Sequence, residues 1–382
     1  MKIIIAPDSF KGSLSAKQAA YCIKNGLKVS FPNATFELIP MADGGEGTMQ
    51  ALVDATNGEI FSKEVKNPLG LTTQAKFGIL GDQKTAVIEM AEASGLQYVD
   101  SATANPLLTS TYGTGELIKA ALDKHVKKII IGLGGSATND GGAGMAQALG
   151  IKLLDSNGNE LEPGGGNLNN LMQIDMQNLD PRLQNIEIIL ASDVTNPLTG
   201  ANGASKIFGP QKGATTQMIE VLDSNLHHFA SVVKRDLGTD FENYPGSGAA
   251  GGLGFGLLSF TKASLHAGVE VVLSLNKFRD KVKDADIIFT GEGATDYQTQ
   301  FGKTPFGVAK AAKDIVPNAP VIILTGNIGK NVDSLYKSGK IDAIFSTESG
   351  AKDLTTAIKD SHHDLTQTAE NIGRLIKTLK FN

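Results

Sequence analysis

The chain has 382 residues, of which 41% are hydrophobic and 20% charged, and its formal net charge is −5. This length and composition indicate two globular domains, and the net negative charge argues against nucleic acid or an anionic membrane as a partner. Cys22 is the only cysteine, which excludes an internal disulfide, and we recognise neither a signal peptide nor a membrane-spanning run. We therefore expect a globular protein of the reducing cytoplasm.

Short aliphatic runs recur along the chain and predict strands buried on both faces, because apolar and polar residues do not alternate within them. After the first run, Ser15 and Gln18 have the spacing of a capping box and predict the start of a helix. Helical patterns follow several other runs, so a parallel sheet covered by helices is expected. The predicted strands are Lys2–Ala6, Phe36–Pro40, Lys128–Ile131, Ile186–Ala191, Asp286–Thr290, Pro320–Thr325 and Ile341–Ser346.

The regular alternation of strand and helix stops near residue 60 and resumes near Asp284. Turn signals in between, at Asn67-Pro-Leu-Gly70 and Leu80-Gly-Asp82, indicate antiparallel pairing. The sequence thus predicts an α/β protein with two domains. A doubly wound parallel domain, Rossmann- or flavodoxin-like, is formed by residues 1–60 and 280–382, and a mixed α/β domain of residues 61–279 is inserted into it. The glycine-rich segment 246–256 is a candidate hinge or loop.

Glycine together with carboxylate or hydroxyl groups follows several of the predicted strands. Ligands bind beyond the carboxyl ends of parallel strands, where glycine lets backbone amides reach a phosphate and carboxylates hold Mg²⁺ or accept a proton. A turn explains one such strand end more easily than a whole set, so the pattern predicts phosphoryl transfer. The stretches are 8–13, 42–48, 134–142, 192–196 and 291–296.

Two further motifs are incomplete. Gly302-Lys303-Thr304 ends like a Walker A loop, but that motif requires glycine where Tyr297 stands. Thr304 and Pro305 instead predict a helix with Thr304 as its N-cap. The stretch Gly134–Thr138 lacks the last glycine of a nucleophile elbow. We therefore expect neither a P-loop NTPase nor a serine hydrolase.

Nine sequence motifs, taken in their order along the chain, make the phosphoryl-transfer prediction more specific. They are Ile5–Ser13, Pro40–Thr48, Glu89–Leu96, Tyr112–Glu116, Gly134–Gly142, Asp193–Leu198, Phe208–Ala214, Gly248–Gly254 and Gly291–Gln298. Together these segments cover essentially the whole chain and strongly resemble the type I glycerate kinase family. The resemblance implies a two-domain α/β fold with the active site in the cleft between the domains. It also implies phosphorylation of D-glycerate by ATP with Mg²⁺, leaning toward the 2-hydroxyl and hence 2-phosphoglycerate, within cytoplasmic glycerate or glyoxylate metabolism.

Catalytic roles are predicted for Asp193, Lys11 and Asp8. Asp193 ends a hydrophobic strand and is interpreted as the general base or a Mg²⁺ ligand, with an Asx-turn as the alternative. Lys11 is expected to bind phosphate or the glycerate carboxylate, and the alternative is an ordinary solvated lysine. Asp8 lies just past a buried strand, where a helix cap is the alternative.

Binding roles are predicted for residues of the other strand ends, with the glycine loop at 134–140 as the best phosphate site. The predicted substrate- or phosphate-binding residues are Ser13, Asp43, Glu46, Gly134, Gly135, Ser136, Asn139, Asp140, Asn196, Gln211 and Lys212. The predicted Mg²⁺ ligands are Glu292 and Asp296.

Three alternatives stay open at this point. The first is phosphorylation of the 3-hydroxyl, since small differences in loop position decide which oxygen reacts. The second is a nucleotide-dependent oxidoreductase, although the glycine fingerprint of that class is missing from the first strand–helix turn at Ser9–Ser13. The third is a non-catalytic sugar-acid binding protein, against which the number of carboxylates at the strand ends counts.

Overall fold

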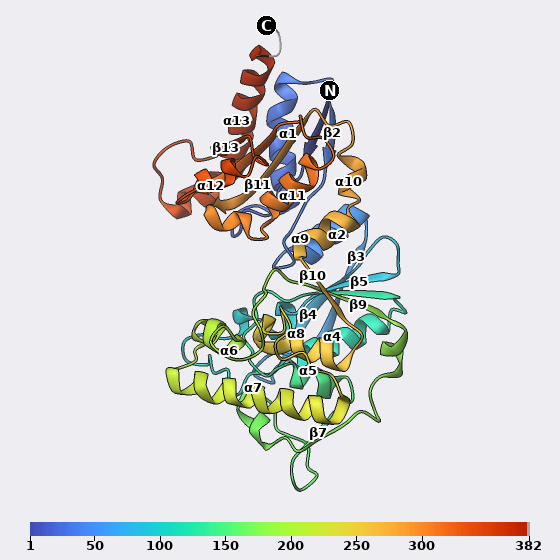
Figure 1. Ribbon diagram of the computed structural model, residues 1–382. Coiled ribbons are helices and arrows are strands. Elements are labelled where there is room, and N and C mark those ends of the chain that lie inside the picture. The colour runs from blue at the N-terminus through green and yellow to red at the C-terminus, as the bar shows by residue number, and fades with distance from the viewer. Residues whose placement is uncertain (380–382) are drawn as a thin grey trace. The chain divides into compact units, whose positions relative to one another are not determined.

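The computed structural model describes residues 1–379, and the chain divides into two compact units. The first unit contains Met1–Asp43, Gln50–Asn57 and the chain from Ala267 onward. The second unit contains Gly44–Met49 and Gly58–His266. The predicted boundaries at 60 and 280 concern independently folding domains and stay a prediction. Figure 1 traces the chain through both units.

The first unit is built on a five-stranded parallel sheet with the order β13-β12-β11-β1-β2. Its strands are β1 Lys2–Ile5, β2 Thr35–Leu38, β11 Ile287–Thr295, β12 Val321–Ile328 and β13 Ala343–Ser346. Ile3 and Ile5 point into one apolar core, and Ile4, on the opposite face, is equally buried. Because both faces of β1 are covered, the aliphatic runs correctly predicted a parallel sheet between helices.

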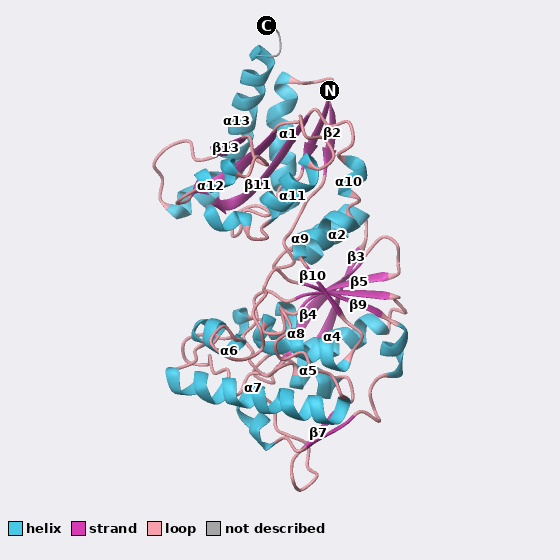
Figure 2. Ribbon diagram, in the orientation of Figure 1, coloured by secondary structure: helices cyan, strands magenta, loops and turns pink. Residues whose placement is uncertain are grey.

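Helices α1 Ala16–Ser30 and α11 Thr304–Lys313 pack against this sheet (Figure 2). The other helices of the first unit are α2 Thr48–Thr56 (from Gln50 onward), α9 Gly268–Leu275, α10 Phe278–Lys281, α12 Asp333–Lys337 and α13 Leu354–Leu379, with a 3₁₀ turn at Tyr297–Gln300. The predicted capping box is confirmed, because the Ser15 side chain and Gln18 satisfy each other's amides at the start of α1. Helices α1 and α13 touch at Gly26, where a Cβ atom would collide with the Thr366 carbonyl.

The second unit contains a six-stranded mixed sheet with the order β10-β9-β6-β5-β4-β3. Its strands are β3 Glu59–Lys66, β4 Thr72–Ile79, β5 Thr85–Glu89, β6 Lys128–Gly132, β9 Glu187–Ala191 and β10 Ser264–His266, with β7 Lys152–Leu154 and β8 Gln173–Asp175 in a separate pair. The turns at 67–70 and 80–82 join the antiparallel strands β3, β4 and β5, as predicted, and the remaining neighbours are parallel.

The helices of the second unit surround a large apolar core. They are α3 Ala91–Ser94, α4 Tyr112–Leu122, α5 Ala143–Ala148, α6 Ala204–Phe208, α7 Thr216–Leu237 and α8 Ala249–Phe260. Short 3₁₀ segments lie at Leu96–Tyr98, Gly165–Asn170, Pro181–Asn185 and Pro210–Lys212. Among residues 1–379, no helix is both long enough and apolar enough to cross a membrane.

The glycine cluster at 246–256 is partly loop and partly helix. Residues 246–248 form a turn, left-handed backbone angles at Ala250, Gly251 and Gly252 kink the first turn of α8, and all residues of α8 are buried, while the role of the segment as a hinge stays a prediction. Gly251 and Gly252 have positive φ angles and lie against the backbone of the 138–141 loop, where a Cβ atom at either position would clash. The glycines therefore permit close packing of helix and loop.

Candidate active site

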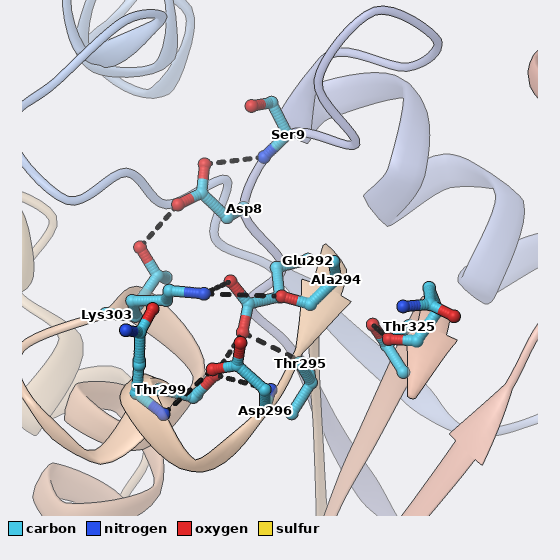
Figure 3. A network of polar contacts seen from close by, with 12 residues as sticks. Asp8, Ser9, Glu292, Ala294, Thr295, Asp296, Thr299, Lys303 and Thr325 are labelled. Atoms are coloured by element: carbon cyan, nitrogen blue, oxygen red, sulfur yellow. Dashed lines mark hydrogen bonds and ion pairs between the residues drawn. The ribbon is translucent and has the colours of Figure 1, made fainter. Parts of the chain in front are cut away.

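Asp8 follows β1 and is held at the carboxyl edge of the sheet in the first unit. Its Oδ1 accepts a hydrogen bond from the Ser9 amide at 2.6 Å (Figure 3). Its Oδ2 accepts one from the Thr304 hydroxyl at 2.6 Å. Burial of the carboxyl group, together with the nearby charge of Asp43, raises the pKa of Asp8 to about 7. Asp8 thus combines a fixed position with a pKa suited to proton exchange near neutral pH.

Glu292 lies on β11, beside the strand that leads to Asp8. Its carboxylate accepts hydrogen bonds from the hydroxyls of Thr295 at 3.1 Å and Thr299 at 2.8 Å, and the Lys303 ammonium is 3.5 Å away (Figure 3). Burial raises the pKa of Glu292, while Lys303 and the two hydroxyls act in the opposite direction. The structure therefore gathers two predicted carboxylates, Asp8 and Glu292, on adjacent parallel strands.

Asp296 serves as a cap in this structure. Its Oδ1 accepts the Gln298 amide hydrogen at 2.8 Å and so begins the 3₁₀ turn at Tyr297–Gln300. Its role as a Mg²⁺ ligand stays a prediction.

The prediction that Thr304 caps α11 is wrong. The cap is Lys303, Thr304 is the first helical residue, and the hydroxyl of Thr304 donates to Asp8. A contact with a distant segment thus overrides the local capping preference.

Lys11 and Ser13 lie in the tight loop that follows Asp8. The loop is closed by a hydrogen bond from the Leu14 amide to the Phe10 carbonyl, and the Ser13 hydroxyl donates to the same carbonyl at 3.1 Å. The Lys11 side chain is exposed. Asp43, at the end of the first unit's N-terminal stretch, is close enough to Asp8 for the two carboxylates to repel each other.

In the second unit, two predicted glycine segments meet around one cavity of about 410 Å³. Gly45 and Glu46 line it from one segment, and Gly134 and Gly135 line it from the other. Glu89, at the end of β5, lies on the same wall and accepts the Met49 amide hydrogen at 2.8 Å. Burial raises the pKa of Glu89 to about 7.

The site assignment from sequence missed Glu89. It stands directly at a strand end within a family segment, which was the available signal.

Lys212 forms hydrogen bonds with the predicted phosphate loop. The side chain is only 1% exposed, and its ammonium donates to the Ser136 hydroxyl at 2.8 Å and the Thr138 carbonyl at 2.6 Å. Burial lowers the pKa of Lys212 to about 7, an effect that the nearby Asp140 carboxylate opposes. Lys212 thus fixes the backbone of the loop that carries Gly134 and Gly135, both of which are exposed.

Asn139 and Asp140, also predicted to bind ligand, are fully buried and contact other parts of the protein. Asp140 accepts hydrogen bonds from the amide and hydroxyl of Thr111 and from the amides of Gly142 and Gly144. The Asn139 amide group donates to the Ser205 hydroxyl at 2.8 Å. In this structure both residues join the loop to the helices behind it.

The remaining predicted residues of the second unit lie after β9 and near α6. Asp193 is half-buried and comes two residues after β9. The Asn196 side chain donates to the Asn202 carbonyl at 2.9 Å. Gln211 is exposed beside the buried Lys212 in the 3₁₀ segment Pro210–Lys212. The binding and catalytic roles of these residues stay predictions.

Glycine loops, half-buried carboxylates and lysines at the carboxyl edges of α/β sheets are typical of phosphotransferases. The sequence model of the glycerate kinase family matches residues 3–377. The chain is 53% identical to a protein named glycerate kinase from Bacillus subtilis, over 100% of this chain and 99% of that protein. It is 49% identical to a glycerate 2-kinase from Escherichia coli, over 98% and 97% of the two chains.

A solved structure agrees with these sequence matches. A crystal structure described under the provisional name glycerate kinase 2, from Salmonella typhimurium LT2, has a TM-score of 0.91 and 47% identity over the whole of both chains. The chain therefore belongs to the glycerate kinase family, as its motifs predicted, and it is a kinase.

Proposed function

We propose that this protein transfers the γ-phosphoryl group of ATP to the 2-hydroxyl of D-glycerate and releases 2-phosphoglycerate and ADP. The observation that carries the proposal is the 49% identity, over 98% of the chain, to the glycerate 2-kinase of Escherichia coli. We also propose that the reaction takes place in the cytoplasm, as part of glyoxylate metabolism.

Phosphoryl transfer to a hydroxyl group is helped by a residue that accepts the hydroxyl proton and by cations that offset the charge of the phosphates. The glycerate hydroxyl oxygen attacks the γ-phosphorus, the bond from that phosphorus to the bridging oxygen breaks, and ADP leaves. We assign acceptance of the hydroxyl proton to Asp193 and charge compensation at the transferring phosphoryl group to Lys11. Asp8, with its pKa raised to about 7, is assigned to proton exchange with the phosphates.

The first unit offers only a few carboxylates as ligands for a Mg²⁺ ion. Among the described residues, no group of three or more histidine, cysteine, aspartate or glutamate side chains is arranged to hold a metal ion. Protein carboxylates commonly supply only one or two ligands to Mg²⁺, and substrate phosphates and water supply the rest. Glu292 and Asp296 would hold the ion, and a cation there would offset the burial that raises the pKa of Glu292. When bound, Mg²⁺ neutralises phosphate charge.

A coupled assay tests the proposal. D-glycerate, ATP and Mg²⁺ are supplied with enolase, pyruvate kinase and lactate dehydrogenase, phosphoglycerate mutase is left out, and ADP is measured separately. Phosphoenolpyruvate formation at the rate of ADP release is expected for a 2-kinase. ADP with 3-phosphoglycerate detected by NMR would move the reaction to the 3-hydroxyl. Without glycerate-dependent ADP, the proposal fails, and a stability shift caused by glycerate alone would favour a binding protein.

A further inference from the structure

The first unit contains a cavity of about 430 Å³ that the assigned catalytic groups do not fill. It is lined by Gly293 of β11, Asn327 of β12, Thr347 just after β13, and Leu354 and Ile358 of α13. It therefore lies at the carboxyl edge of the parallel sheet, where ligands of open α/β sheets bind. Its volume falls within the range of about 300–1,000 Å³ that is usual for small-molecule sites.

One wall of the cavity is an apolar strip with no protein cover. Helix α13 carries an apolar stripe in which Leu365 and Ile372 are buried in the core shared with α1. Leu354 and Ile358 continue this stripe toward the N-terminus of the helix but are 76% and 38% exposed. Apolar side chains left exposed at the edge of a cavity favour a ligand with an apolar face of its own.

Other residues that line the cavity are polar. Asn327, Thr347 and Glu348 supply amide, hydroxyl and carboxylate groups, which suit the edge of a nucleobase and the hydroxyls of a ribose. Lys352 also lines the cavity, but its ammonium is held by Asp364 at 2.6 Å and Asp360 at 3.0 Å.

Lys11 is the second lysine on the wall, and it lies in the loop that follows Asp8. The backbone of Lys11 lies beside Gly293, the residue that follows Glu292, so Lys11 lines the cavity next to the segment that carries this carboxylate.

We propose that this cavity binds the adenosine part of the phosphate donor, with the phosphates directed toward Lys11. The inference rests on the proposed function and adds the place of the nucleotide. Glycerate is too small and too polar to use the apolar strip, whereas a purine has two apolar faces and a polar edge. The cavity of the second unit suits the nucleotide less well, because three glutamates line it, Glu46, Glu89 and Glu92, whereas Glu348 is the one carboxylate among the described residues that line the cavity of the first unit.

Two substitutions on α13 test the inference. Ala357→Phe places a ring in the cavity from the wall, and Leu354→Glu places a negative charge on the apolar strip at a position that is already exposed. Thr355 is exposed on the same helical turn and does not line the cavity, so Thr355→Phe and Thr355→Glu are matched controls. The full-length variants are titrated with a fluorescent ATP analogue, and KM is measured separately for ATP and for D-glycerate.

We expect both cavity variants to raise KM for ATP and Kd for the analogue about tenfold or more. The KM for glycerate should stay close to that of the wild type, and the controls should behave like the wild type. Adenosine should displace the analogue from the wild type. If Ala357→Phe lowers the melting temperature, Leu354→Glu decides, because Leu354 makes little contact with the core.

The outcomes separate this inference from the proposed function. Glycerate phosphorylation with an unchanged KM for ATP in both variants would overturn the cavity assignment and leave the function intact. Displacement of the analogue by tripolyphosphate but not by adenosine would also overturn it. Conversely, loss of analogue binding in the two cavity variants, without any glycerate-dependent ADP from the wild type, would support the cavity and defeat the function.

Discussion

Replacement of Asp140 tests whether this carboxylate holds the second unit together. Its two oxygens accept four hydrogen bonds: from the Thr111 amide and hydroxyl, both at 2.8 Å, and from the amides of Gly142 at 3.1 Å and Gly144 at 3.2 Å. These bonds connect the start of α4 with the start of α5. Asp140→Ala would leave all of these donors buried without the acceptor.

The expected loss follows from the number of donors. Each buried donor left unsatisfied lowers stability by about 1–3 kcal/mol. Burial disfavours the Asp140 carboxylate and raises its pKa, so removal of this group offsets part of the lost stability. We therefore expect Asp140→Ala to lower the free energy of unfolding of the second unit by about 3–5 kcal/mol. Asp140→Asn keeps one acceptor oxygen at Thr111 but turns an amide group toward Gly142, so a loss of about 1–3 kcal/mol is expected.

Hydrogen exchange read by mass spectrometry is the suitable assay, because a chain of two units need not unfold in one step. The peptides to follow cover α4 and α5. Asp155→Ala is the control, since Asp155 also accepts backbone amides, from Asn157 and Asn159, but in an exposed turn. A loss below about 1 kcal/mol for Asp140→Ala would refute the reasoning, because the donors would then have found other acceptors.

Three further predictions concern the candidate site. In Asp8→Asn, the change of kcat/KM with pH near pH 7 should disappear. The free energy of unfolding of this variant should also increase relative to that of the wild type as pH increases. The reason is that the wild type gains stability from protonated Asp8 at low pH and loses it as pH rises through about 7. Asp193→Asn should remove most of kcat and leave the circular dichroism spectrum unchanged. Lys212→Met should lower kcat about tenfold or more and should also lower stability, because the Ser136 hydroxyl and the Thr138 carbonyl lose their buried donor and the Asp140 carboxylate loses a nearby cation.

Each of these predictions has an opposing result. An unchanged pH profile in Asp8→Asn would exclude Asp8 from proton exchange. Asp54→Asn is the control, since the half-buried Asp54 pairs with Lys17 at 3.2 Å. Near-normal turnover in Asp193→Asn would end its assignment as the base. For Lys212, the wild type should lose stability as pH falls from the alkaline range toward 7, because the pKa of Lys212 is lowered by burial. A Lys212→Met variant with the same pH dependence of stability as the wild type would contradict the burial of the charge.

Much of the fold could be predicted because its signals are local. Continuous aliphatic runs such as Lys128–Ile131 correctly located buried strands, and the capping box at Ser15 correctly located the start of α1. The signals at 67–70 and 80–82 correctly predicted antiparallel turns, since turn chemistry depends on few residues. The sequence also predicted that Asp8 and Glu292 lie at the same edge of the sheet, because the carboxyl ends of parallel strands share an edge.

What could not be predicted depends on contacts between distant segments. Thr304 has the local signal of a cap, but its hydroxyl is engaged by Asp8 from the other end of the chain. Glycine-rich segments also look alike in sequence, whether they approach a ligand or another backbone. Gly134 is exposed beside a cavity, whereas Gly251 is buried against the 138–141 loop.

The place of β1 in the first unit has a consequence for biosynthesis. Ile3 of β1 pairs with Phe36 of β2 on one side and with Ile287 of β11 on the other. During translation β11 leaves the ribosome only after the whole second unit. Until then the aliphatic strand β1 has one edge without a partner strand. The second unit, in contrast, has all of its strands once His266 has been made. We therefore expect the inserted unit to fold first on the ribosome, and a chain interrupted after His266 to carry a folded body with an apolar N-terminal strand that chaperones would recognise.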